Sequence, residues 1–214
     1  MHLTEIRMFG NSSNNMNLAR LLTFILFILL SINSVAQDYK ASIKQRFAEY
    51  SALMVAHEFD KSLDYVPEAI FTVVPRPQLV TLFAQVFNNK DMEVKMISFN
   101  IKEISDSRKI DSCYYANIKY TSVMSMKINS DTTESSEVKV NRLSMTKAAF
   151  ANAFGSDNVK LDETTETFTI SPTKSSWAIS KNGQDGWKFV NVEPKQRLLM
   201  EKILPKELIE ESIN

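Results

Sequence analysis

His57 is the side chain in this sequence best suited to acid–base chemistry, because an imidazole gains and loses a proton near neutral pH. It closes an apolar series with helical spacing: Ile43, Phe47, Tyr50, Met54 and His57. The series predicts one face of a helix and directs His57 toward the interior of the fold. Two interpretations follow. We favour a core histidine paired by one hydrogen bond, and the alternative is a general base or ligand contact in a pocket.

Several aromatic side chains would accompany His57 in such a pocket. Tyr50 shares its helix face, Tyr65 follows at a bend, and two more tyrosines lie on a predicted strand. An apolar cavity with a few polar tips is the usual composition of a small-molecule site. The candidate ligand-binding residues are Tyr50, Met54, His57, Tyr65, Tyr114 and Tyr120. Their alternative is a purely structural role in the core, which aromatic residues at strand spacing usually have.

The remaining reactive residue types form no recognisable catalytic set. Asp60 and Asp64 are four residues apart on a predicted helix, and we interpret them as solvated charges. Cys113 is the only cysteine, so no disulfide can form within the chain, and we interpret it as a small buried hydrophobe. Glycine-rich phosphate loops and His-Glu-x-x-His motifs do not occur. We therefore predict no catalytic residue, no metal ligand and no cofactor, although a carboxylate-rich cation site stays open.

The charge balance excludes one broad class of partner. The 214 residues include 25 basic and 25 acidic side chains, of which two and one lie within residues 1–36. The remainder therefore has a net charge of −1. A near-neutral chain without a basic cluster argues against nucleic acid, since binding to phosphates needs concentrated Lys and Arg. It also argues against electrostatic attachment to anionic membranes.

The N-terminus carries the features of a secretory signal. Residues 21–32 form an apolar block of twelve residues, shorter than the about 20 that span a bilayer. A small-residue cleavage site, Ser-Val-Ala, follows at residues 34–36. These features predict a signal peptide over residues 1–36 and a periplasmic or secreted mature protein without an integral membrane anchor. Met16 is an alternative start, and an uncleaved anchor is the alternative to cleavage.

Helical spacing recurs in further segments. A short helix is predicted over residues 60–65, a longer one from Pro77 to a stop at Asn88-Asn89, and a third over residues 145–154, capped by Ser144. Residues 195–214 are predicted to form a helical tail broken near Pro205. Its predicted buried positions are Leu198, Leu199, Ile203, Leu208 and Ile209.

From Met92 onward apolar and polar residues alternate with a period of two, which predicts strands. The clearest strand runs from Cys113 to Ile128, and residues 138–140 are predicted to resume a strand after a polar loop. Asn182-Gly183 predicts a hairpin between the last two strands. The later strands are centred on Phe168, Trp177 and Phe189.

This order of elements resembles the NTF2-like superfamily. One stretch that carries the resemblance is the helical bend at residues 59–71, FDKSLDYVPEAIF. The other is the closing strand at residues 187–190, WKFV, which is similar to the Trp-x-Phe ending common in the family. The resemblance implies an α+β fold over residues 37–194, in which N-terminal helices pack on a curved antiparallel sheet, the NTF2-like cone. Enzymes of the family use an acid/base set inside the cone, and no such set is carried over to this chain.

Two functions from different classes follow. We expect an exported soluble domain that binds a small apolar ligand or a protein partner without catalysis. The alternative is a cone-fold enzyme of the isomerase or hydrolase type with His57 in its pocket. Fold does not fix function. The absence of a recognisable acid/base pair in the sequence therefore favours the non-catalytic binding domain. Two carboxylates, or a carboxylate beside His57, in one cavity would decide for the second.

Overall fold

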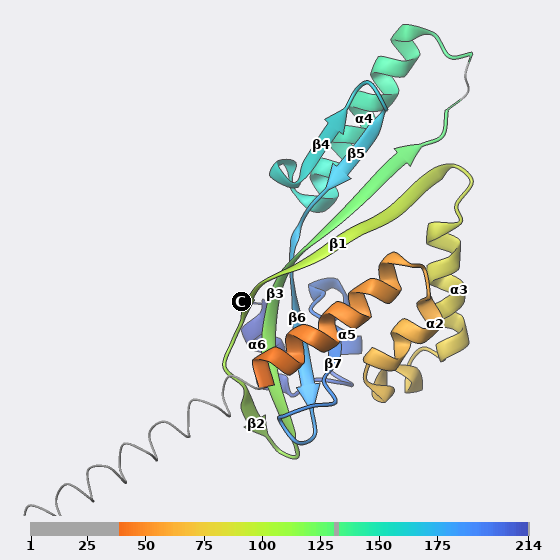
Figure 1. The fold of residues 1–214 in the computed structure, drawn as a ribbon. Helices are drawn as coiled ribbons and strands as arrows, with labels where there is room; N and C mark the ends of the chain where they lie inside the picture. Colours follow the sequence, from red (N-terminus) through yellow and green to blue (C-terminus); the bar gives the residue numbers. More distant parts are fainter. Residues whose placement is uncertain (1–38, 131–132, 214) are drawn as a thin grey trace, which may run out of the picture. The chain divides into compact units, whose positions relative to one another are not determined.

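The structure, a computed structural model, describes residues 39–130 and 133–213 and is organised around one long central strand, β3 (Cys113–Ile128). The predicted signal peptide lies outside the described residues. Residues Ala41–Asn214 make one compact unit that includes the tail. Within it, the described strands form a curved, unclosed antiparallel sheet of seven strands (Figure 1).

Each edge of β3 pairs with two other strands. One edge carries β1 (Met92–Ile104) and β2 (Arg108–Ile110). The other carries β5 (Thr167–Ile170) and β6 (Thr173–Ser180). The outer strands β4 (Val159–Asp162) and β7 (Lys188–Asn191) pair with β5 and β6 respectively.

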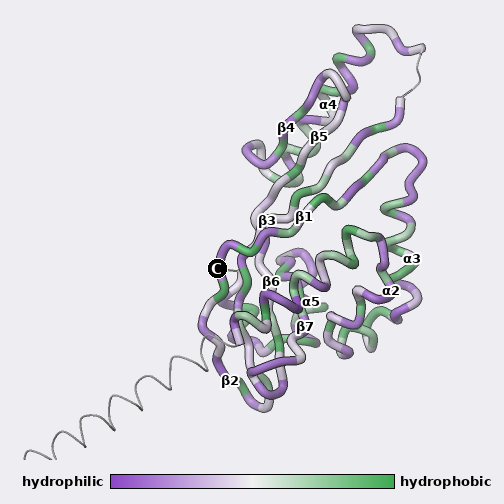
Figure 2. Tube along the Cα trace, viewed as in Figure 1, coloured by the Kyte–Doolittle hydropathy of each residue, from purple (hydrophilic) through white to green (hydrophobic). Residues whose placement is uncertain are grey.

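The period-two prediction is confirmed for β3. Its even-numbered residues from Ala116 to Met126 are all buried, because they face the helices that cover the sheet. Figure 2 shows this strand with both hydrophobic and hydrophilic residues along its length. In β1 the alternation shifts: the register slips between Met96 and Ser98, and Ile97 between them is 52% exposed. Such a bulge moves one residue out of the pairing and bends the strand.

The N-terminal segment is helical, as predicted. A first helix occupies residues 39–55, and Figure 1 shows it in orange beside the sheet. Four shorter elements follow: α2 (Phe59–Ser62), η1 (Leu63–Tyr65), η2 (Glu68–Thr72) and α3 (Arg76–Phe87). Arg76 joins the two ends of this bend, because its guanidinium lies 2.8 Å from Asp60 Oδ1 and 2.7 Å from Asp64 Oδ1. The two aspartates are therefore exposed and ion-paired.

Phe47 anchors the first helix to the sheet. Its ring centroid lies 5.0 Å from that of Tyr120 on β3 and 5.1 Å from that of Phe189 on β7, both in edge-to-face geometry. Edge-to-face pairs of this kind stabilise a fold beyond their buried area. Ile43 and Met54, on the same helix face, are also buried.

The prediction of a strand at residues 138–140 is wrong, because α4 (Ser136–Phe154) begins there. The side chain of Ser135 caps it by accepting a hydrogen bond from the Val138 amide. Val138 and Val140 are both exposed, so their spacing of two residues does not mark the buried face of a strand. The buried positions Leu143 and Thr146, with half-buried Phe150, follow helical spacing. The helix is thus much longer than the predicted segment 145–154.

The tail is helical and breaks at Pro205, as predicted. It consists of η4 (Pro194–Gln196), α5 (Arg197–Met200) and α6 (Lys206–Ile213). Leu208 and Ile209 are buried, but the predicted burial of Leu198 is wrong, because this side chain is 81% exposed. Met200 and Leu204 take the buried positions instead. The tail packs on Tyr115, Trp177 and Val190, which point to the sheet face opposite the first helix.

These elements confirm the predicted α+β fold class. N-terminal helices cover one face of a curved antiparallel sheet, and a short C-terminal helix ends the described chain. Both faces of the sheet are therefore covered near the start of β3. Two covered faces give two places where a pocket can form.

Candidate functional site

Three of the predicted site residues pack together under the first helix. Tyr50 and Tyr120 both contact the Phe47 ring, with centroids 6.0 Å and 5.0 Å away, and the Tyr65 ring lies 6.3 Å from Tyr50. Met54 is buried on the same helix face. Burial raises the pKa of Tyr50 to about 12 and also raises that of Tyr120. These side chains fill the core between helix and sheet.

The hydroxyl groups of Tyr65 and Tyr120 have partners within the protein. Tyr65 donates a hydrogen bond to Glu49 Oε2 at 3.0 Å, and Arg46 lies over its ring at 4.5 Å. Tyr120 donates to Asn191 Oδ1 at 2.9 Å. Hydrogen bonds of this kind satisfy the polar tips of core aromatics. The core interpretation of the tyrosines therefore fits their geometry.

The prediction that His57 points into the fold is wrong. The first helix ends at residue 55, so helical spacing no longer applies at residue 57, which is exposed. Its backbone is left-handed, with φ +59°, an uncommon conformation for a residue with a Cβ. The imidazole instead stacks on Phe59 with centroids 5.4 Å apart and lies 4.9 Å from the Phe87 ring.

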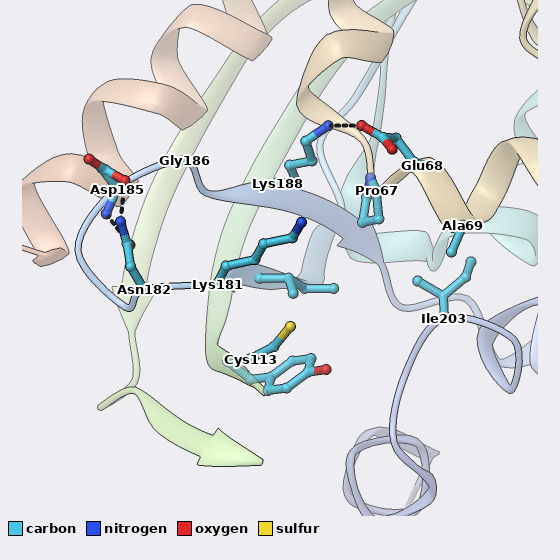
Figure 3. A pocket seen from close by; sticks show the side chains of 12 residues that line it. Pro67, Glu68, Ala69, Cys113, Lys181, Asn182, Asp185, Gly186, Lys188 and Ile203 are labelled. Atoms are coloured by element: carbon cyan, nitrogen blue, oxygen red, sulfur yellow. Dashed lines mark hydrogen bonds and ion pairs between the residues drawn. The ribbon is translucent and has the colours of Figure 1, made fainter. Parts of the chain in front are cut away.

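A pocket of about 480 Å³ opens on the other face of the sheet, the one that carries the tail (Figure 3). Its floor is a row of paired residues across three strands: Tyr115 on β3 lies opposite Ile179 on β6, which lies opposite Lys188 on β7. Cys113 and Lys181 extend this floor at one end. None of the six predicted ligand-binding residues is among the described residues that line it.

Three further segments make the walls. Pro67, Glu68 and Ala69 come from η2 and the residue before it, and Ile203 comes from the tail. The β6–β7 hairpin contributes Asn182, Asp185 and Gly186. In Figure 3, Ala69 and Ile203 face Lys181 and Cys113 across the pocket.

The hairpin that forms one wall is held by its own side chains. The buried Ser180 hydroxyl accepts a hydrogen bond from the Gly183 amide at 3.0 Å and lies 2.6 Å from the Asp185 carbonyl oxygen. Asn182 Oδ1 accepts from the amides of Gln184 and Asp185, at 2.9 Å and 3.0 Å. Asparagine commonly fixes turns in this way. The wall is therefore pre-formed.

Two side chains on the floor could take part in chemistry. Cys113 is a half-buried free thiol, and Figure 3 shows its sulfur directed toward the pocket. Burial raises the pKa of Tyr115, and the neighbouring Cys113 side chain adds to the increase. A tyrosine whose pKa is raised stays protonated at neutral pH, so its hydroxyl can donate a hydrogen bond to a ligand.

A second pocket, of about 400 Å³, lies between α4 and β4. Its lining combines Val140, Leu143 and Leu161 with charged residues of both signs. The neighbouring Glu166 is ion-paired with Lys139 and Arg142, at 2.7 Å and 2.6 Å. The ion pairs beside this pocket link α4 to the loop before β5.

The sequence contains a signal for the pocket on the tail side in the apolar residues on both faces of β3. Tyr115 lies on the strand face opposite Tyr114 and Tyr120, and Trp177 and the tail supply further large apolar residues. A strand with apolar residues on both faces is covered on both faces. A tail that covers the second face incompletely leaves a pocket at its border.

Other kinds of site find no support in the described chain. Within residues 39–130 and 133–213, no group of three His, Cys, Asp or Glu side chains lies close enough to hold a metal ion. Across the same ranges, every helix is too short or too polar to cross a membrane. Comparison with known proteins found no matching family model, curated protein or solved structure. The pocket must therefore be interpreted from its own geometry.

Proposed function

We propose that this chain is an exported, non-catalytic binding domain that holds a small, largely apolar molecule in the pocket bordered by η2, the β6–β7 hairpin and the tail. The observation that carries the proposal is a concave space of about 480 Å³ over a floor whose centre, Tyr115 and Ile179, is apolar. Small-molecule sites commonly enclose about 300 to 1,000 Å³ and combine apolar walls with a few polar groups.

The composition of the lining supports binding more than catalysis. Tyr115, Ile179, Ala69 and Ile203 offer apolar surface, and burying such surface is the main favourable term in binding. The two carboxylates at the border are engaged: Glu68 lies 3.8 Å from the Lys188 ammonium, and Asp185 accepts a hydrogen bond from Asn182 at 2.6 Å. No histidine is among the described lining residues, so a typical general base is missing there.

Export and family membership belong to the same proposal. The apolar block at residues 21–32 and the small residues after it support export. Membership of the NTF2-like superfamily is supported by the order of elements, from helices through a bend to antiparallel strands. A pocket on the tail side of the sheet would then lie outside the helix-covered interior where that resemblance places a site.

Binding can be tested with the uncharged fluorescent probe N-phenyl-1-naphthylamine. We expect a saturable rise in its fluorescence with the purified protein. Ala69→Trp should abolish the rise, because Ala69 faces the pocket and an indole would fill it (Figure 3). Ala52→Trp, on the exposed side of the first helix, is the matched control and should bind as the wild type does. No saturable binding, or equal binding by both variants at equal melting temperature, would overturn the proposal.

A further inference from the structure

The charged groups around the pocket differ in what they contact. Lys188 is held near Glu68, and Asp185 is held by Asn182. Lys181 makes no ion pair or hydrogen bond with any described residue. In Figure 3 its side chain extends over the pocket, whereas Asp185 lies beyond the hairpin with its carboxylate directed away. Of the two lysine ammonium groups among the described lining residues, that of Lys181 is therefore the one without an ion pair.

The surroundings of this ammonium are apolar. Lys181 directly follows the end of β6, Ile179 on that strand lines the same pocket, and Tyr115 is paired with Ile179. Lysine commonly lays its methylene stem along apolar surface and keeps its charge at the edge. A molecule on this floor would meet apolar surface along its length and one positive charge at one end.

We infer that the bound molecule is a monocarboxylic acid with an apolar body, whose carboxylate pairs with Lys181 while its body lies on Tyr115, Ile179 and Ile203. This inference rests on the proposed function. A lysine ammonium is a compact point charge, which suits one carboxylate. Phosphate groups are usually held by several donors or by the planar fork of an arginine, and arginine is not among the described lining residues.

The strength expected of the ion pair is modest. Lys181 is exposed, and exposed ion pairs gain little over their hydrated partners. The carboxylate should therefore improve affinity by about two- to fivefold, with the apolar body supplying the rest. Because salt screens exposed charges, the improvement should shrink as ionic strength rises.

The test uses two ligands of equal length that differ only in the head group. Decanoate and 1-decanol are compared by displacement of N-phenyl-1-naphthylamine at low salt, below the concentrations at which they aggregate. We expect decanoate to displace the probe at about two- to fivefold lower concentration, and this advantage to disappear in 0.5 M salt, an ionic strength of roughly three times the physiological value.

Lys181→Met keeps an apolar stem of similar length and should remove the advantage of decanoate while leaving decanol unchanged. Lys181→Arg should retain it. Lys160→Met, on β4 and outside this pocket, is the control and should behave as the wild type does. Equal binding of the two ligands by the wild type would overturn the inference and leave the proposed function standing. If neither the probe nor either ligand binds, the proposed function fails with it.

Discussion

Tyr114 and Tyr115 are adjacent residues that serve opposite faces of the sheet. The Tyr114 ring packs against Gly183 of the hairpin, while Tyr115 forms the pocket floor and contacts the tail. Successive strand side chains must point to opposite faces. A one-residue shift in the assignment of this strand therefore moves the candidate site from one side of the sheet to the other.

Gly183 should be the least replaceable glycine of the hairpin. Its φ is +74°, and a Cβ added there would lie 2.8 Å from ring atoms of Tyr114. Gly186 has φ +62° but open space around it. Gly186→Ala should lower the free energy of unfolding by about 1 kcal/mol from backbone strain alone. Gly183→Ala should lose at least about 1 kcal/mol more from overpacking. Urea denaturation measures both, and equal losses would show that Tyr114 moves aside without cost.

At the scale of elements, α4 is held by a cluster of ion pairs. Arg142 bonds Glu134 and Glu166 together, and Lys139 adds a second contact to Glu166. Hydrogen bonds from Lys139 and then from Arg142 lower the pKa of Glu166 from its usual 4.5 to about 2. The same guanidinium lowers the pKa of Glu134.

This cluster should make the free energy of unfolding depend on pH in the acidic range. A carboxylate whose pKa is lower in the folded state stabilises the fold above its unfolded pKa, and loses that contribution as the pH falls through its folded pKa. The urea concentration at the unfolding midpoint of the wild type should therefore decrease as the pH is lowered from 4.5 to about 2. Glu166→Gln should show a smaller fall over this interval. Glu163→Gln, which removes a carboxylate without a described ion pair, should fall as steeply as the wild type. If the urea midpoints of all three proteins decreased equally with pH, the stabilising role of the Glu166 carboxylate would be contradicted.

The tail should contribute to stability through one side of its helices only. Leu208 is fully buried against the sheet, and Leu198 is 81% exposed. Leu208→Ala should cost about 2 to 5 kcal/mol through lost packing and the cavity left behind. Leu198→Ala should stay within about 0.5 kcal/mol of the wild type. Thermal melting of the two variants distinguishes them, and similar melting temperatures would mean that the tail is not docked as described.

Two further contacts fix the end of the tail. The Trp177 indole donates a hydrogen bond to Ser212 Oγ at 2.9 Å, and Arg108 on β2 pairs with Glu211. Arg108 also lies over the Trp177 ring, 5.6 Å from its centroid. α6 is thereby tied to two strands of the sheet face that carries the pocket.

Regular patterns made most of the elements predictable. The alternation along β3, the helical spacing in α3 and Asn182-Gly183 in the hairpin each specify local structure, and each of these elements is confirmed. The length of α4 was underestimated because two exposed valines at its start have the spacing typical of a strand. The pocket on the tail side of the sheet was not predicted, for two reasons. The first helix ends before His57, and the cover on the second sheet face comes from residues far away in the sequence. Local periodicity carries no information about either.

At the scale of the whole molecule, processing remains the clearest prediction. The exported protein should begin at Gln37, because small residues follow the apolar block. N-terminal sequencing of protein recovered outside the cytoplasm gives the answer directly. Ala36→Arg should block cleavage at this position, while Asp38→Asn, just beyond it, should not. Exported protein that still carries residues 16–36 would contradict the prediction.

The central position of β3 also sets the order in which the chain can fold. Asn117 on β3 bonds Ser175 on β6 across 58 residues of sequence, and Tyr120 bonds Asn191 on β7 across 71. Among the pairings of β3, only those with β1 and β2 are local, so its other edge stays open until β5 and β6 are synthesised. Closing such long loops slows folding. During that interval the open edge can pair with another chain. The nascent protein is therefore most vulnerable to aggregation between the synthesis of β3 and that of β6.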